Sequence, residues 1–479
     1  MTTKNSSARI FSCSGRSTGG LALIIALGLT GCASAPDSSL PATPAAASNA
    51  ALAAVQPPSQ WSAAQAAAAD AQPVAAQWWR DFGSAELDGL VDTALVANRD
   101  LQAIAARMAQ ARALVDGAAA ERRPRVDATA SVQRGRNSSD DPRAERSVAG
   151  LRAGWEVDVF GRGAAAVDAA GADARSAEET LAAARIALAA DVATAYFELR
   201  TLHRRILLAA ESAQLAELQL NVAQRKFDAG QATALDVERW RAEVAQERAL
   251  AVELDGSLRV RNRQLALLLG VSRAPTLMLA DGTAAPQPPA LLLPGALLEQ
   301  RPDVRRQARA LDGALARVGV ARRDLYPRVQ IEWSGARERL AAIGGSATPV
   351  TLTGLGVSLS MPLLDGGRIR ANIAVQEARA REAMADYEKA MLAALADVEV
   401  GLTQWTAAET ALARWQQARN ASATATSRAE RLYEAGMVDV SAVLDVRRGE
   451  LRAQDMTSQA EGARWASAVA LRRAFAGPV

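Results

Sequence analysis

Cys32 is the residue of this 479-residue chain whose surroundings most clearly indicate a chemical reaction. It ends the run Leu29-Thr30-Gly31-Cys32, which resembles a bacterial lipobox, the motif in which the cysteine thiol receives a diacylglyceryl group and the chain is cut before it. In front of it stand three basic residues without an acid, and then an apolar run from about Gly19 to Gly31. That run is shorter than the roughly 20 residues of a transmembrane helix, so residues 1–31 are predicted to be a lipoprotein signal peptide. The alternative is an ordinary signal peptide that happens to carry a cysteine.

Lipidation of Cys32 would anchor the mature chain in a membrane. Cleavage removes Cys13 and leaves Cys32 as the only thiol, so the mature chain cannot form an internal disulfide. A diacylglyceryl group and an N-acyl group, palmitate among them, supply more than one acyl chain, which is enough for stable anchoring. Ala33 follows the cysteine, whereas an Asp at this place often marks inner-membrane retention in Gram-negative lipoproteins. By that resemblance we expect a lipid-anchored protein of the cell outer membrane.

Other reactive side chains are scarce in the sequence. His203 is the only histidine and lies within a helical pattern, and we find no phosphate-binding loop or metal-ligand spacing. The formal charge of +3 comes from 55 basic and 52 acidic residues, and the signal peptide carries three of the basic ones. The mature chain is therefore balanced, and without a basic block interleaved with aromatic residues, nucleic acid is not an expected partner. The sequence predicts neither an enzyme nor a cofactor beyond the covalent lipid on Cys32.

The elements that position these residues form a mainly helical chain with two β segments. Residues 32–76 are rich in Ala, Pro and Ser and are predicted to be a tether, because this composition cannot bury a core. Residues 77–270 have the pattern of a helix, a hairpin, a long helix, a tight turn and a helix. We expect the first helix from about residue 91 to 122, the strands over about 124–158, and the long helix over about 164–228, roughly 98 Å long.

The same order of elements occurs a second time. Pro124 and Pro327 are 203 residues apart, and Gly230 and Gly436 are 206 apart, so the register barely changes over a whole repeat. This agreement predicts an internal duplication. The predicted segments of the second half are a linker over 271–298 and a repeat over 299–476 that contains strands over about 327–362.

Geometry then constrains the assembly. The two shorter helices of each repeat add up to the length of the long one, so they can stack along it, with all four strands at one end and both turns at the other. Four strands cannot close a barrel, and a bilayer does not tolerate an open sheet edge, so a closed structure requires an oligomer. A trimer would supply twelve strands. Within the strands, Trp155 and Trp333 either anchor at the bilayer interface or pack where strands meet helices.

The two tight turns occupy matching positions in the repeats. In each, glycine is predicted to take the left-handed conformation of a helix C-cap, and an N-cap follows. Thr233 and Asp236 form a capping-box-like pair after the first turn, whereas Ala442 takes the place of Asp236 after the second. The turn residues are Ala229, Gly230 and Gln231 in the first repeat and Ala435, Gly436 and Met437 in the second.

Four segments carry a family resemblance that extends from Trp78 to Phe475. They are WWRDFGSAELDGLV, LRAGWEVDVFGR, LLEQRPDVRRQARALDGALARVGVARRDLYPRV and PLLDGGRIRANI. With them the chain resembles the TolC-type outer membrane factors, specifically the lipoprotein branch of tripartite efflux systems (the NodT/OprM-like group). The resemblance implies a mainly α fold with a β membrane part, in which a homotrimeric 12-stranded β-barrel, four strands per chain, continues into a long α-helical barrel in the periplasm. It also implies a passive export duct that engages a periplasmic adaptor and, through it, an inner-membrane pump of the RND type.

Site residues also follow from the resemblance. The six turn residues would form the tip that docks the adaptor. Asp439 and Asp445 lie where family members place gate acids in a constricted tip; otherwise Asp439 is an N-cap and Asp445 belongs to a solvated helix face. Asp236 is a weaker candidate, since Ala442 matches it in the second repeat.

Two other functions stay open at this point. One is a structural coiled-coil lipoprotein that spans the periplasm without a pore, which would have no use for four strands at one end. The other is the outer-membrane partner of a type I protein-secretion system, although the lipobox and LLEQRPDV favour multidrug or metal efflux. The sequence does not identify the substrate.

Overall fold

The computed structural model describes residues 40–41, 43–62, 77–135, 144–279, 292–342, 346 and 348–475. The signal peptide and Cys32, with the lipidation predicted there, lie outside these residues. Residues 42–479 form one compact unit, distinct from residues 1–41. Its elements are α2 (Pro44–Val55), η1 (Trp78–Phe82), α3 (Ala85–Ala97), α4 (Arg99–Ala120), β1 (Arg125–Gly135), β2 (Ala144–Val157), α5 (Arg162–Asp228), α6 (Ala234–Leu268), α7 (Pro294–Gln300), α8 (Pro302–Arg323), β3 (Arg328–Ala342), β4 (Thr348–Ser360), α9 (Arg368–Glu434) and α10 (Val440–Phe475).

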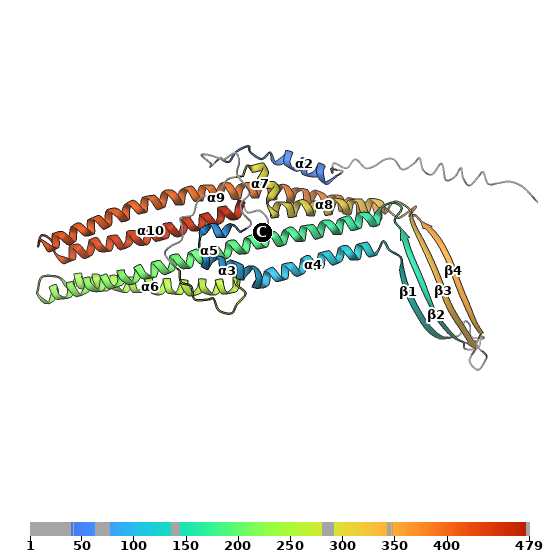
Figure 1. The fold of residues 1–479 in the computed structure, drawn as a ribbon, viewed down its shortest axis with the longest axis horizontal. Helices are drawn as coiled ribbons and strands as arrows, with labels where there is room; N and C mark the ends of the chain where they lie inside the picture. Colours follow the sequence, from blue (N-terminus) through green and yellow to red (C-terminus); the bar gives the residue numbers. More distant parts are fainter. Residues whose placement is uncertain are drawn as a thin grey trace, which may run out of the picture. The chain divides into compact units, whose positions relative to one another are not determined.

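The four strands gather at one end of the helices, and the α5–α6 and α9–α10 turns lie at the other (Figure 1). The strands form one antiparallel sheet in the order β1-β2-β3-β4, so the β2–β3 pairing joins the hairpins of the two repeats. Successive side chains along a strand point to opposite faces, and the two faces differ in polarity. One row across the sheet is Val126, Ala153, Trp333 and Leu355, and the next row, on the other face, is Asp127, Arg152, Ser334 and Gly354.

The long helices repeat each other in length and position. α5 and α9 have 67 residues each, and their first residues, Arg162 and Arg368, are 206 apart. α4 and α6 both pack on α5, and α8 and α10 both pack on α9. α5 also packs on α8 and α10, which joins the two repeats. The internal duplication and the packing of two shorter helices on each long one are therefore confirmed.

The shorter helices that stack along each long helix, α4 and α6 on α5 and α8 and α10 on α9, meet at a joint. At each joint a polar side chain links the ends of two helices. Asn98 lies between α3 and α4, caps α4 with its side-chain oxygen, and donates from Nδ2 to the Leu268 carbonyl at the end of α6 (2.9 Å). Arg301, which occupies the matching place between α7 and α8, donates from Nη1 to the Ala474 carbonyl near the end of α10 (3.3 Å). The single helix predicted over residues 91–122 is wrong, because this cap divides it into two helices at Asn98.

Gly270, just past the end of α6, packs closely against the backbone of the first joint, at Ala97. Its φ is +68°, and a Cβ there would lie 2.2 Å from the Ala97 carbonyl oxygen. We expect Gly270→Ala to lower the free energy of unfolding by at least about 1 kcal/mol, because the left-handed conformation alone disfavours a Cβ by that amount and the overlap adds to it. Thermal denaturation of the purified protein measures the change. Gly117→Ala, in α4 with nothing within 4 Å of the added Cβ, is the control and should be neutral or stabilising; equal losses in both variants would contradict the prediction.

Part of the predicted tether is an ordered segment. α2 begins after Thr43, and its buried residues Ala47 and Ala51 lie four apart on one helix face, which packs on α8 and α9. Trp61 is buried as well: its indole N–H donates to the Leu292 carbonyl (2.7 Å), and its ring packs edge-on against Phe475. The prediction of a tether over residues 32–76 is therefore wrong for residues 44–62. Composition did not reveal this ordered segment, because an alanine side chain is buried only where another element packs directly against it.

An aromatic cluster forms the middle of the core. Phe82 of η1 packs against Phe197 of α5 and Trp465 of α10, and the last two rings stack with centroids 4.3 Å apart. Trp78 and Trp79 are fully buried beside them. An 18-residue window of α5 has a mean hydropathy of 1.3, enough by length and composition to cross a membrane, but half of it is buried within the unit. This burial identifies α5 as a core helix, to which the WWRDF segment is fixed.

Candidate functional site

The two turns at the helical tip have the same backbone geometry. Gly230 and Gly436 both have φ of +72°, as predicted for helix C-caps. In the first turn the Gln231 amide donates to the Lys226 carbonyl (2.7 Å), and in the second the Met437 amide donates to the Leu432 carbonyl (2.8 Å). This is the Schellman arrangement, in which glycine ends the helix and reverses the chain. All six predicted turn residues are exposed.

The helices that follow the turns begin in different ways. α6 has a complete capping box: Asp236 accepts from the Thr233 amide (2.9 Å), and Thr233 accepts from the Asp236 amide (3.3 Å). This prediction is confirmed. At the matching place before α10 stands Asp439, and Ala442 provides no second cap. The first turn therefore stabilises its own helix start, whereas the second depends more on contacts from elsewhere.

Those contacts come from α5. The Lys226 ammonium pairs with the Asp439 carboxylate and also donates to the Ser441 hydroxyl (3.2 Å). Gln219, which is buried on α5, donates from Nε2 to the Ser441 carbonyl (3.2 Å). The hydrogen bond from Lys226 lowers the pKa of Asp439 below its ordinary value. We call Gln219, Lys226, Asp439 and Ser441 the tip clamp, since they hold the start of α10 against α5.

Asp445 has a different set of neighbours. It lies 3.7 Å from the Arg448 guanidinium, one helical turn along α10. Arg448 also pairs with Glu243 of α6 (3.2 Å), and its guanidinium lies over the Trp240 ring, 5.1 Å from the centroid. Asp445 thus belongs to a contact between α10 and α6, and its side chain is 54% exposed.

The structure does not bring the two predicted gate acids together within one chain. Each has its own basic neighbour, Lys226 for Asp439 and Arg448 for Asp445. The sequence analysis missed both partners. Arg448 could have been found from its helical spacing to Asp445, whereas Lys226 lies 213 residues from Asp439 and no local pattern links the two.

The remaining candidates lie away from the tip. His203 is exposed on α5, in keeping with a surface residue. Trp155 donates its indole N–H to the Arg122 carbonyl (2.8 Å) just past the end of α4, so it packs at the junction of strands and helices. Trp333 is 41% exposed on the apolar face of the sheet.

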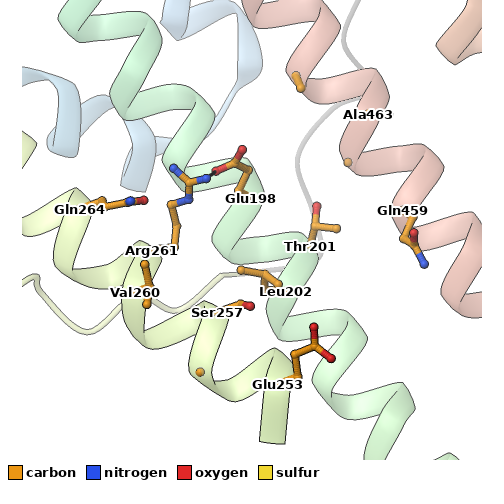
Figure 2. Close-up of a pocket in the computed structure, with 13 residues that line it drawn as sticks. Glu198, Thr201, Leu202, Glu253, Ser257, Val260, Arg261, Gln264, Gln459 and Ala463 are labelled. Atoms are coloured by element: carbon orange, nitrogen blue, oxygen red, sulfur yellow. Dashed lines mark ion pairs between the residues drawn. The ribbon is translucent and has the colours of Figure 1, made fainter. Parts of the chain in front are cut away.

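A groove of about 840 Å³ lies between α5, α6 and α10 (Figure 2). In Figure 2 the Glu198 and Arg261 side chains point toward each other across it, and their charged groups are 2.5 Å apart. Thr201 lies where α5 and α10 approach closely, since a Cβ on Gly462 would come within 2.6 Å of its hydroxyl. Among the residues that the structure describes, no group of three or more His, Cys, Asp or Glu could hold a metal ion.

Comparison with known proteins decides what this architecture belongs to. The sequence profile of the family described as outer membrane efflux protein matches residues 90–271 and 293–477. The chain belongs to this family. It is 31% identical over 435 residues to the pyoverdine export outer membrane protein OpmQ of Pseudomonas aeruginosa, covering 88% of this chain and 91% of OpmQ. It is 32% identical over 451 residues to the outer membrane protein OprJ of the same species, covering 89% of each. The solved structure of the outer-membrane channel OprN superposes with a TM-score of 0.77 at 30% identity, covering 88% of this chain and 96% of that one.

Membership of the outer membrane efflux protein family explains the segregation of strands and helices. The chain is an outer-membrane export duct of a tripartite system, with its sheet in the membrane and its helices extending into the periplasm. Members are trimeric channels, so the four strands of each of three chains complete the barrel that one chain cannot close. Because these channels are passive, the prediction that the chain is not an enzyme is confirmed, and the interpretation as a pore-less tether is wrong.

Proposed function

We propose that the helical tip is the regulated end of the duct: its two turns dock the periplasmic adaptor, and Asp439 and Asp445 gate the opening. The observation that carries this proposal is the tip clamp, in which Lys226 of α5 pairs with Asp439 at the start of α10. Three copies around a closed tip would place these acids in rings, where like charges need basic partners or bound cations. The clamp joins the α5–α6 pair to the α9–α10 pair, so any opening that moves these pairs apart must break it.

We propose docking at the turn residues because they are exposed and because the Schellman hydrogen bonds fix their backbone. We expect Gly436→Glu to weaken adaptor binding, since it strains a position with φ of +72° and adds a charge to the docking surface. Gly436→Asn is the matched control, because asparagine tolerates the left-handed conformation and adds no charge. Cross-linking to the adaptor and drug efflux by cells measure the effect. Unchanged cross-linking and efflux in Gly436→Glu, or equal losses in both variants, would contradict docking at the turn.

The pump is proposed to be of the RND type and the cargo a small molecule. OpmQ, whose name records pyoverdine export, supports a small-molecule cargo over secretion of a protein by a type I system. Co-expression with RND pump and adaptor pairs in a strain lacking its own ducts would test this. Restored drug resistance supports the proposal, whereas restored secretion of a type I protein substrate alone would reject it.

We also propose that Cys32 carries the lipid, on the strength of the lipobox that precedes it. Cys32→Ser is expected to abolish acylation and signal processing at this site, and mass spectrometry of the purified N-terminus measures both. Trimer assembly should survive, because the sheet itself supplies a membrane anchor. A wild-type protein without acyl groups on Cys32 would refute the proposal.

A further inference from the structure

Two arginines stand on the apolar face of the sheet. Arg337 and Arg339 of β3 share this face with Val329, Ile331 and Trp333, since all five alternate with residues of the polar face. In a membrane barrel the apolar face contacts lipid. β3 is an inner strand whose neighbours, β2 and β4, belong to the same chain. A second chain therefore does not cover these side chains by pairing with β3.

The cross-strand neighbours of the two arginines carry no negative charge. Arg337 has Ala149 and Thr351 as cross-strand neighbours, and Arg339 has Ser147 and Pro349. These neighbours are small or uncharged, and both guanidinium side chains are exposed.

Most other arginines of the sheet have a carboxylate partner. Arg125 pairs with Asp127 (2.9 Å), Arg146 with Glu338 (2.6 Å) and Arg328 with Asp324 (2.8 Å). Arg337 and Arg339 have no such partner among the residues that the structure describes. Within β1–β4, the one acid on the lipid-facing side is Glu145, and Arg134 already pairs with it (2.7 Å). Counted over the residues of β1–β4 alone, the lipid-facing side carries an excess of two positive charges per chain at this end of the sheet.

The height of the arginines matches the edge of a bilayer. Val329 lies at the helix-proximal end of β3, and Arg337 and Arg339 follow eight and ten residues later. At about 3.3 Å per residue and a strand tilt of about 40°, they stand roughly 20 and 25 Å above Val329. The apolar band of a membrane barrel is about 25 Å tall, so the guanidinium groups reach the headgroups of the outer leaflet.

Aromatic anchors are absent from that end of the strands. Trp155 and Trp333 are the aromatic residues of β1–β4, and both lie in the helix-proximal half of their strands. Membrane barrels usually carry an aromatic girdle at each interface. At the far interface of this sheet, arginines stand where such a girdle is expected.

We propose that Arg337 and Arg339 form a binding site for the phosphate groups of an anionic, phosphorylated glycolipid in the outer leaflet. A guanidinium binds phosphate through paired N–H donors, and two of them about 7 Å apart on one strand face can hold two phosphates of one headgroup. The Ser147 and Thr351 hydroxyls stand beside them as further donors. The acyl chains of the same lipid lie along the apolar rows below.

The test measures lipid retention by the purified trimer. Native mass spectrometry follows binding of bisphosphorylated lipid A, with a monophosphorylated form for comparison and inorganic phosphate as competitor. The variants are Arg337→Gln with Arg339→Gln together, each substitution alone, and Arg152→Gln as the matched control. Arg152 is an exposed strand arginine on the opposite face, and within the described part of the chain it also lacks a carboxylate partner.

We expect the double variant to bind bisphosphorylated lipid A at least about tenfold more weakly, because two charge-assisted contacts are lost. Each single variant should lose part of this affinity, and Arg152→Gln should bind as the wild type does. Wild-type binding by the double variant, or an equal loss in Arg152→Gln, would overturn the proposal. Displacement of the lipid by millimolar inorganic phosphate would also overturn it, since the site would then select a free ion. If the double variant does not assemble as a trimer, the single variants decide between these outcomes.

Discussion

Replacing Arg301 with alanine is expected to lower the free energy of unfolding by roughly 3 kcal/mol. The guanidinium binds Asp303 through two N–H groups (Nε 3.0 Å, Nη2 2.6 Å) and Asp397 of α9 through Nη2 (2.9 Å). It also donates to the carbonyls of Ala394 and Ala474. One side chain therefore joins the α7–α8 joint to α9 and to the end of α10.

The size of this effect follows from where the charge lies. The Arg301 side chain is only 10% exposed, so its loss leaves two carboxylates facing each other and takes the donor from the Ala474 carbonyl, which lies in the last turn of α10 and has no partner within its helix. Asp303 and Asp397 are 42% and 58% exposed, and water can solvate them in part, which puts the loss at the lower end of the range for buried pairs. Burial alone would raise the pKa of Asp303, but the Arg301 guanidinium holds it below its ordinary value.

Thermal loss of the trimer and of its circular dichroism signal measures the Arg301→Ala effect. Arg259→Ala is the control, because Arg259 pairs with Asp255 on the surface of α6, where the arginine is 77% and the aspartate 43% exposed. It should leave stability unchanged, since exposed pairs contribute little. An Arg301→Ala protein as stable as the Arg259→Ala protein would show that the joint does not depend on this contact.

The double substitution Asp439→Ala and Asp445→Ala is expected to change the resting conductance of the channel and to lower its preference for cations. Three-fold symmetry repeats each acid three times around the tip, and rings of aspartate favour cations in a narrow pore. Removing Asp439 also releases Lys226, so the tip clamp loses its ion pair and α10 is held to α5 less firmly. Single-channel recording in planar bilayers measures both quantities. If the acids only cap or solvate their helices, the double variant will conduct like the wild type, and the gating proposal fails.

Lys226→Met distinguishes the effect of the tip clamp from the effect of the aspartate charges repeated around the tip. It breaks the ion pair but keeps both acids, so it should raise resting conductance while cation preference persists or increases. The depressed pKa of Asp439 sets the pH range of the clamp: its contribution is present at neutral pH and down to about the ordinary value of 3.8, and it is lost as pH falls further through the folded-state value. In Lys226→Met the pKa of Asp439 should return toward 3.8, which NMR titration can detect. Unaltered conductance in this variant would show that the pair does not restrain the tip.

The order of the elements, the duplication and the need for an oligomer were predictable from the residues alone. These follow from local signals: alternation with period two in the strands, Pro124 and Pro327 at the helix ends, and Gly230 and Gly436 in the turns. The 206-residue offset between the turns reappears between the first residues of α5 and α9. Each strand, helix end and turn depends on residues a few positions apart, so it can be predicted without the fold. Comparison of the two halves of the chain then reveals the duplication.

Which side chains meet across those elements became visible only in the folded chain. Lys226 reaches Asp439 over 213 residues, Asn98 reaches the end of α6, and α2 finds a surface on α8 and α9. The joint at Asn98 escaped sequence analysis because the apolar pattern continues past this residue. Asn98 caps α4 through a local contact with the Leu101 amide, whereas its contact with the Leu268 carbonyl is visible only in the fold. The partners of a charged or capping group depend on distance in space between segments far apart in the chain, and no local period encodes that distance.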